Sequence, residues 1–146
     1  MKIQVNNIHS VNSLSLIKLL KDLKSDRIEV VGSDVLPKGE YAGSLLVDKY
    51  YIAPPVSEEN NYLAFLNHVF QKERIDLLIP ASDAEALFLS KYKEKIDVPF
   101  FLADESTVKF FKDKLICSQK LSEQGVLVPP IITDLRNENK IIFRKR

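Results

Sequence analysis

Glycine is scarce in this chain: only 4 of its 146 residues are glycine, and none lies in residues 6–12, the polar turn after the first predicted strand. A dinucleotide-binding fingerprint needs glycines in that turn, because backbone amides must come close to a pyrophosphate. The sequence also lacks the glycine-rich phosphate loop of P-loop proteins. Classical NAD or FAD binding and P-loop chemistry are therefore not expected, even on a Rossmann-like fold.

Cysteine and long apolar segments are also nearly missing. Cys117 is the only cysteine, so no internal disulfide can form and we expect a reducing compartment. The chain does not open with the charged and then apolar segments of a secretory signal. No apolar run approaches the ~20 residues that cross a membrane. These features predict a soluble cytoplasmic protein without a membrane partner.

Neither sign of charge dominates, since 21 Lys and Arg stand against 20 Asp and Glu for a net charge of +1. Nucleic-acid binding usually requires a basic surplus that neutralises phosphates, so we expect no nucleic-acid partner. The two histidines, His9 and His68, fall on different predicted elements, and no neighbouring Cys or carboxylate completes a metal site. We predict no metal ligand in this chain, and we interpret Cys117 as a small buried residue.

Short apolar segments alternate with amphipathic ones, which is typical of βαβ units and a parallel sheet. We therefore predict a three-layer, Rossmann-like α/β domain with a mainly parallel sheet of four to five strands. Continuous apolarity at residues 77–79 predicts a strand in the middle of that sheet, covered on both faces. Strands are expected at residues 2–6, 27–32, 45–47, 75–80 and 98–102, and helices after a cap at Asn12 or Ser13, at 58–73, from Ser82 or Asp83 to 89, at 105–111 and at 113–124.

Polar residues follow the predicted strands, at the edge where open parallel sheets bind ligands. Asn7, His9 and Ser10 follow the first strand and could bind a small anion near a helix N-terminus, or simply form a capped polar turn. Asp83 and Glu85 follow the strand at 75–80. They could orient a substrate, or Asp83 could cap the next helix with Glu85 favoured by the helix dipole.

The final residues predict a boundary. Pro129 and Pro130 are typical of a domain end, and the apolar residues 141–143 resemble the opening of another strand. We therefore expect one domain at residues 1–128, followed by a linker and the first strand of a truncated module at residues 129–146.

Several motifs in this order resemble the N-terminal part of ATP-grasp ligases, especially proteins like the carbamoyl-phosphate synthase large subunit. The resemblance spans essentially the whole chain, and its most specific part is the run at residues 75–80 followed by Asp83 and Glu85. The motifs are Val30-Val31-Gly32-Ser33-Asp34, Val47-Asp48-Lys49-Tyr50-Tyr51, Ile75-Asp76-Leu77-Leu78-Ile79-Pro80, Asp113-Lys114, Gly125-Val126 and Ile141-Ile142-Phe143-Arg144.

This resemblance implies an ATP-dependent ligase that joins a small carboxylate substrate to an amine or ammonia, with ATP and Mg²⁺ bound in the full-length protein. It implies that Lys114 and Arg144, or Lys145 in another register, contact the nucleotide, and that Asp83 and Glu85 lie on the substrate side. The ATP-grasp module itself would lie beyond Arg146 or on a separate chain, so this chain alone would be inactive. The alternatives are a stand-alone small-anion-binding or regulatory module and, against the glycine evidence, an oxidoreductase.

Overall fold

The computed structural model of the protein describes residues 1–23 and 28–129. The chain forms two compact units, Met1–Glu105 and Ser106–Arg146, and each is described by itself. The first unit contains the whole sheet and the residues that follow its strands. It is therefore the unit that positions the candidate site.

The sheet is open and entirely parallel. Its strands are β1 (Lys2–Asn6), β2 (Glu29–Asp34), β3 (Lys49–Ile52) and β4 (Leu77–Ile79), in the order β3-β2-β1-β4. The chain thus passes from β1 outward to β2 and β3 and then returns to the other side of β1. The boundary between β1 and β4 is the topological switch point, where crevices form at the carboxyl ends of strands.

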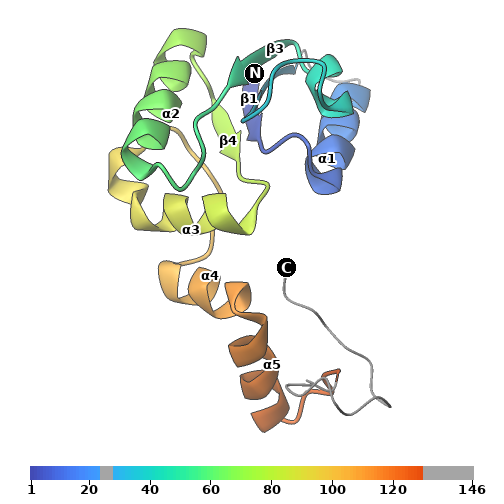
Figure 1. Cartoon of the computed structure of the whole chain (residues 1–146), viewed down its shortest axis with the longest axis vertical. Helices are drawn as coiled ribbons and strands as arrows, with labels where there is room; N and C mark the ends of the chain where they lie inside the picture. Colours follow the sequence, from blue (N-terminus) through green and yellow to red (C-terminus); the bar gives the residue numbers. More distant parts are fainter. Residues whose placement is uncertain (24–27, 130–146) are drawn as a thin grey trace. The chain divides into compact units, whose positions relative to one another are not determined.

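Helices cover both faces of this sheet (Figure 1). The first unit contains α1 (Val11–Asp22), the short 3₁₀ helix η1 (Ala42–Leu45), α2 (Glu59–Glu73), α3 (Asp83–Lys91) and the 3₁₀ turn η2 (Lys93–Lys95). They are followed by α4 (Glu105–Lys112) and α5 (Lys114–Glu123). This arrangement confirms the predicted three-layer α/β class with four strands.

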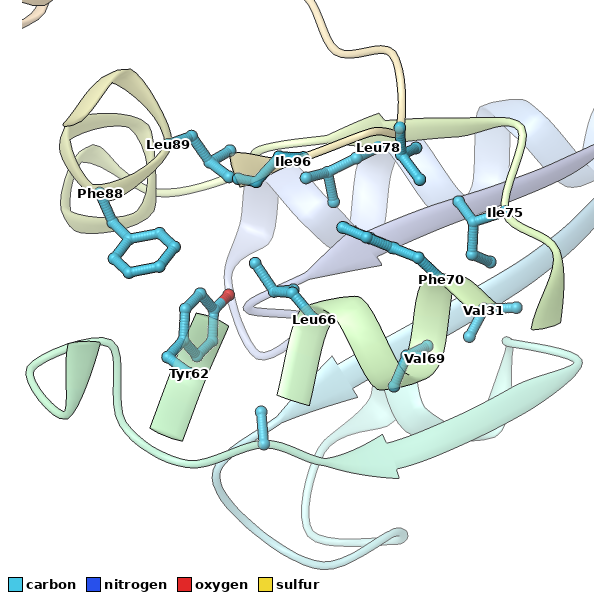
Figure 2. Close-up of a cluster of buried hydrophobic side chains, with 12 residues drawn as sticks. Val31, Tyr62, Leu66, Val69, Phe70, Ile75, Leu78, Phe88, Leu89 and Ile96 are labelled. Carbon is cyan, nitrogen blue, oxygen red and sulfur yellow. The ribbon is translucent and has the colours of Figure 1, made fainter. Parts of the chain in front are cut away.

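Alternation along the strands divides the core into two layers, because successive side chains point to opposite faces. Ile3, Val5 and Val30 pack with Ile17 and Leu20 of α1. On the other face, Val31 and Leu78 pack against α2 and α3, and Figure 2 shows this cluster with the hydroxyl of Tyr62 at its border. Gln4 and Asn6 therefore lie on the α2 and α3 face, beside an otherwise apolar layer.

The predicted strand at residues 45–47 is wrong. Leu45 belongs to η1, Leu46 is exposed, and only Val47 is buried, against the α1 layer. Pairing with β2 starts later, where Asp48 N donates to Val30 O at 2.9 Å, and continues through Lys49–Ile52. β3 is an edge strand and is only partly buried, so its sequence, with Tyr50 and Tyr51 at the half-buried positions, is less apolar than Leu45-Leu46-Val47 before it.

The expected strand at residues 98–102 is reduced to a single bridge between Leu78 and Phe100. Pro99 accepts a hydrogen bond from Leu78 N at 2.9 Å but has no N–H to extend the ladder. Consequently β4 is the last strand of the sheet on its side, rather than a central one, and β1 and β2 are the two inner strands.

One predicted cap is wrong, and for another the structure selects between the two predicted residues. Ser10, and not Asn12 or Ser13, caps α1 by accepting a hydrogen bond from Ser13 N. Ser82 rather than Asp83 caps α3, where its Oγ accepts from Glu85 N at 3.2 Å. In both helices the serine immediately before the first turn has the extended backbone that a cap requires, and the alternative residues are already helical.

Candidate functional site

The switch point between β1 and β4 brings four predicted site residues to one edge of the sheet. Asn7 and Ser10 follow β1, and Asp83 and Glu85 lie in the first turn of α3, which follows β4. Because β1 and β4 are neighbours and parallel, their carboxyl ends meet at the same edge. The sheet therefore gathers residues that are more than 70 positions apart in the sequence.

Glu85 is the centre of a buried polar cluster at this edge, and its side chain is fully buried. Its Oε1 accepts hydrogen bonds from Asn6 Nδ2 at 2.5 Å and Tyr62 Oη at 2.9 Å, and its Oε2 accepts from Ala81 N at 3.2 Å. These bonds join the ends of β1 and β4 to the first turns of α2 and α3. Glu85 thus fixes the geometry of the crevice as well as contributing a carboxylate to it.

Further donors extend the cluster through Asn6. Its Oδ1 accepts from Gln4 Nε2 at 2.8 Å and from Ser33 Oγ at 2.6 Å. Gln4 Oε1 is buried and has no hydrogen-bond partner among the described residues. The donors of this hydrogen-bond network therefore point in one direction. Gln4 and Ser33 donate to Asn6, and Asn6 donates to the carboxylate of Glu85.

Burial without a cationic partner raises the pKa of Glu85, although hydrogen bonds from Asn6, Tyr62 and Ala81 N oppose the shift. Burial, and then the nearby carboxylate of Glu85, raise the pKa of Tyr62 strongly. The phenol is therefore a permanent donor at ordinary pH. Perturbed groups of this kind at a strand-end crevice are typical of functional sites.

Beside the cluster is a small crevice with a volume of about 40 Å³, enough for one small polar group or a few water molecules. Asn7 and Glu85 line it, whereas Ser10 does not. The lining residues are Asn6, Asn7, Ser33, Asp34, Val35, Ala53, Pro54, Val56, Tyr62, Ser82 and Glu85. Asn7 has a left-handed backbone, with φ of 54°, which turns the chain sharply after β1.

The structure separates Asp83 from this crevice. Asp83 is exposed and lines a neighbouring open groove of about 350 Å³ between the starts of α1 and α3. Ser10 is occupied as the cap of α1, where its hydroxyl also contacts Ser13 Oγ at 2.8 Å. Of the four predicted residues in this unit, Asn7 and Glu85 thus come together, and Asp83 and Ser10 lie to one side of them.

Sequence reasoning missed Tyr62 as a member of the site, and it placed Asn6 and Asp34 at the strand ends without giving either residue a role. Asn6 and Asp34 are the last residues of β1 and β2, so their position at the strand ends was a usable signal. Tyr62 lies at an apolar position of α2, where the sequence predicts only core packing. Its role depends on the contact with Glu85, 23 residues away.

The two predicted nucleotide contacts do not lie in the first unit. Lys114 is the first residue of α5, and its Nζ donates to Phe111 O at 2.8 Å. Arg144, with its alternative Lys145, lies outside the described residues. Asp113 caps α5 by accepting from Leu115 N and Ile116 N.

Cys117 and His68, the other residues that the sequence analysis considered, lie outside the crevice lining. Within the described residues, Cys117 is buried and His68 is exposed on α2. No group of three or more His, Cys, Asp or Glu side chains in the described part of the chain could hold a metal ion. None of the helices in residues 1–23 and 28–129 is long and apolar enough to cross a membrane.

The chain matches known proteins in its three-dimensional structure. Glycinamide-RNase-transformylase T from Mycobacterium tuberculosis matches with a TM-score of 0.61 and 14% identity, over 90% of this chain and 37% of its own. L-amino acid ligase from Bacillus licheniformis matches with a TM-score of 0.58 and 16% identity, over 97% and 35%. The fold is that of the N-terminal domains of ATP-grasp enzymes.

A third match carries bound ligands. The biotin carboxylase domain of Hydrogenobacter thermophilus 2-oxoglutarate carboxylase, solved with MgADP, ADP and bicarbonate, has a TM-score of 0.57 and 17% identity, over 92% of this chain and 30% of its own. At these identities the likeness establishes the fold, and the chain spans about a third of the length of the structures it matches. No protein-family model and no curated protein sequence matches the chain.

Proposed function

We propose that this chain is the N-terminal domain of an ATP-dependent ligase of the ATP-grasp class, which joins a small carboxylate to an amine or ammonia. One observation carries the proposal: a crevice with a buried, cation-free carboxylate lies at the switch point of a sheet whose fold matches ATP-grasp enzymes over 90% or more of this chain. The domain would line the substrate side of the active site, with Asn7 and Glu85 at the crevice and Asp83 and Ser10 at its border.

The nucleotide would be bound mainly by groups other than the described ones. Of the two predicted contacts, only Lys114 is described, and the described residues contain no metal-binding cluster. They do not by themselves fit ATP and Mg²⁺, so the groups that bind both would lie outside the described residues. In the full-length protein, ATP would supply the phosphoryl group that activates the carboxylate, and Lys114 and Arg144 would contact the nucleotide.

The proposal includes a domain boundary. Residues 1–128 would form the N-terminal domain, and residues 129–146 the linker and first strand of the ATP-grasp module. The remainder of that module would come from the same chain or from a partner chain. A relationship to carbamoyl-phosphate synthase in particular remains a prediction from the sequence motifs.

The test begins with the size of the natural gene product, determined by immunoblot and intact mass. We expect a product larger than the 16.7 kDa of this chain, or a separate ATP-grasp chain that copurifies with it. The 146-residue chain should form no ADP from ATP, whereas the complete protein should form ADP when given its carboxylate and amine. A 16.7 kDa product without such a partner, or enzyme-like ATP turnover by the isolated chain, would contradict the proposal. The first of these outcomes favours the stand-alone binding module.

A further inference from the structure

A histidine and a buried aspartate pair directly beside the crevice. The His9 Nδ1 and Asp34 Oδ2 atoms are 2.9 Å apart, and His9 N donates to the same oxygen at 2.9 Å. The Asp34 side chain is 1% exposed and lines the crevice, whereas the His9 side chain is 43% exposed. The imidazole is therefore fixed from the inside and open to solvent on its outer edge.

The partners of Asp34 determine the tautomer of His9. An ionised carboxylate only accepts hydrogen bonds, and Asp34 already accepts from His9 N and, through Oδ1, from Val35 N at 2.8 Å. The contact with His9 therefore requires the proton on Nδ1. In the neutral imidazole this leaves Nε2 as a hydrogen-bond acceptor. Nε2 has no partner among the described residues, and the ring is held against Tyr41, with centroids 5.1 Å apart.

The crevice itself offers acceptors and no cation. Its lining includes the carboxylates of Asp34 and Glu85 and the amide of Asn7, but no lysine or arginine among the described residues. A small anion would meet two carboxylates there without a compensating positive charge. A group that donates hydrogen bonds and carries positive charge would be complemented by them.

We infer that His9, oriented by Asp34, is a binding residue for the amine substrate, whose N–H donates to His9 Nε2 next to Asp34, the residue that His9 contacts and that lines the crevice. This inference rests on the proposed function for its place in an active site, and it assigns the amine or ammonia nucleophile, rather than the carboxylate substrate, to this edge of the sheet. Asp34 is the positioning residue, because it acts through the imidazole. The same geometry argues against the small-anion module as the role of this crevice.

The test uses the full 146-residue chain and the ¹⁵N signals of its two imidazoles, so His68 on the exposed side of α2 is an internal control. At a pH where the imidazoles are neutral, we expect His9 in the Nδ1–H tautomer and His68 in the mixture of a free side chain. Methylammonium chloride should shift the His9 Nε2 signal, and sodium acetate at equal ionic strength should leave it unchanged. A His9 signal in the Nε2–H tautomer, or one that moves with acetate alone, would overturn the inference.

Variants keep the test independent of ligase activity. His9→Gln should weaken methylammonium binding about tenfold, as loss of one hydrogen bond to a charged group predicts, and His68→Gln should not change it. Asp34→Asn replaces one of the two accepting oxygens by an NH2 group and should weaken the preference for the Nδ1–H tautomer, while circular dichroism verifies that the fold is retained. If these results hold but the complete protein forms no ADP, the proposed function fails and the amine site stands. If the complete protein is an active ligase and His9→Gln leaves its KM for the amine unchanged, the inference fails alone.

Discussion

Two glutamates at opposite ends of the same sheet have opposite surroundings. Glu73, the last residue of α2, lies at the amino ends of the strands and is 4% exposed. It pairs with Lys49 Nζ at 2.5 Å and Lys2 Nζ at 3.5 Å, and it accepts a hydrogen bond from Tyr51 Oη. Glu85, at the carboxyl ends, is also buried and accepts from a tyrosine, but no lysine or arginine of the described residues pairs with it.

The difference appears in the pKa of each carboxyl group. Hydrogen bonds from Lys49 and Tyr51 and the charge of the lysines lower the pKa of Glu73 to about 2, against the opposing effect of burial. Burial without a cation raises the pKa of Glu85. One end of the sheet therefore neutralises its buried carboxylate, and the other holds it with dipoles alone.

This contrast separates stability from function within one unit. The amino end is an ion-pair cluster that needs no further partner. The carboxyl end holds a buried carboxylate next to a crevice with three neutral hydrogen-bond donors, and the crevice lining contains no cation among the described residues. Such local departures from the best electrostatic arrangement are expected at functional sites.

The largest expected effect is at the carboxyl end. Glu85→Ala removes the acceptor of three donors, Asn6 Nδ2, Tyr62 Oη and Ala81 N, and leaves them buried. We expect a loss of about 3 kcal/mol in the free energy of unfolding, measured in urea. The exposed glutamate of η2 is the matched control, and Glu94→Ala should change this free energy by less than about 0.5 kcal/mol. Equal effects of the two substitutions would show that the Glu85 cluster does not hold the edge together.

A smaller effect is expected at the amino end. Glu73→Ala should cost about 1–2 kcal/mol in urea unfolding, because it breaks the bonds to Tyr51 and Lys49, but both lysines regain water easily. The side chain of Lys49 is already 44% exposed and that of Lys2 is 30% exposed. The cost should decrease in about 1 M NaCl, where exposed ion pairs are screened, while that of Glu85→Ala stays constant. A cost above that of Glu85→Ala would reverse the comparison.

The smallest expected effect is a change of a few degrees in Tm with pH. The contributions of Glu73 and Glu85 to Tm should change with pH in opposite directions. The folded-state pKa of Glu73 is lowered from 4.5 to about 2, so its contribution is present above pH 4.5 and is lost as the pH falls towards 2. The folded-state pKa of Glu85 is raised above 4.5, so its contribution is greatest below that pH and is lost as the pH rises.

Thermal unfolding of the wild type, Glu73→Gln and Glu85→Gln between about pH 3 and 8 measures both slopes. The advantage of the wild type over Glu73→Gln should shrink on acidification. Its stability relative to Glu85→Gln should instead decrease on going to neutral pH. Parallel curves for the two variants would mean that the two carboxyl groups share one electrostatic environment.

The sequence by itself determined the features that depend on short-range physics. The bounds of β1 and α2 follow from alternation and helical spacing. The α/β class followed from the same alternation. Prediction failed where pairing decides the outcome, as at residues 45–47 and 98–102, because a short apolar run does not specify its partner strand.

Only the tertiary structure decided which polar residues form the site. Glu85 meets Asn6 across 79 positions, and His9 meets Asp34 across 25, because β1 became the neighbour of both β4 and β2. The sequence contains Glu73 and Glu85 as two similar helical glutamates. The pKa values of their carboxyl groups differ because of burial and because the strand order brings lysines near to Glu73. Desolvation is a property of the folded surroundings rather than of the residue itself.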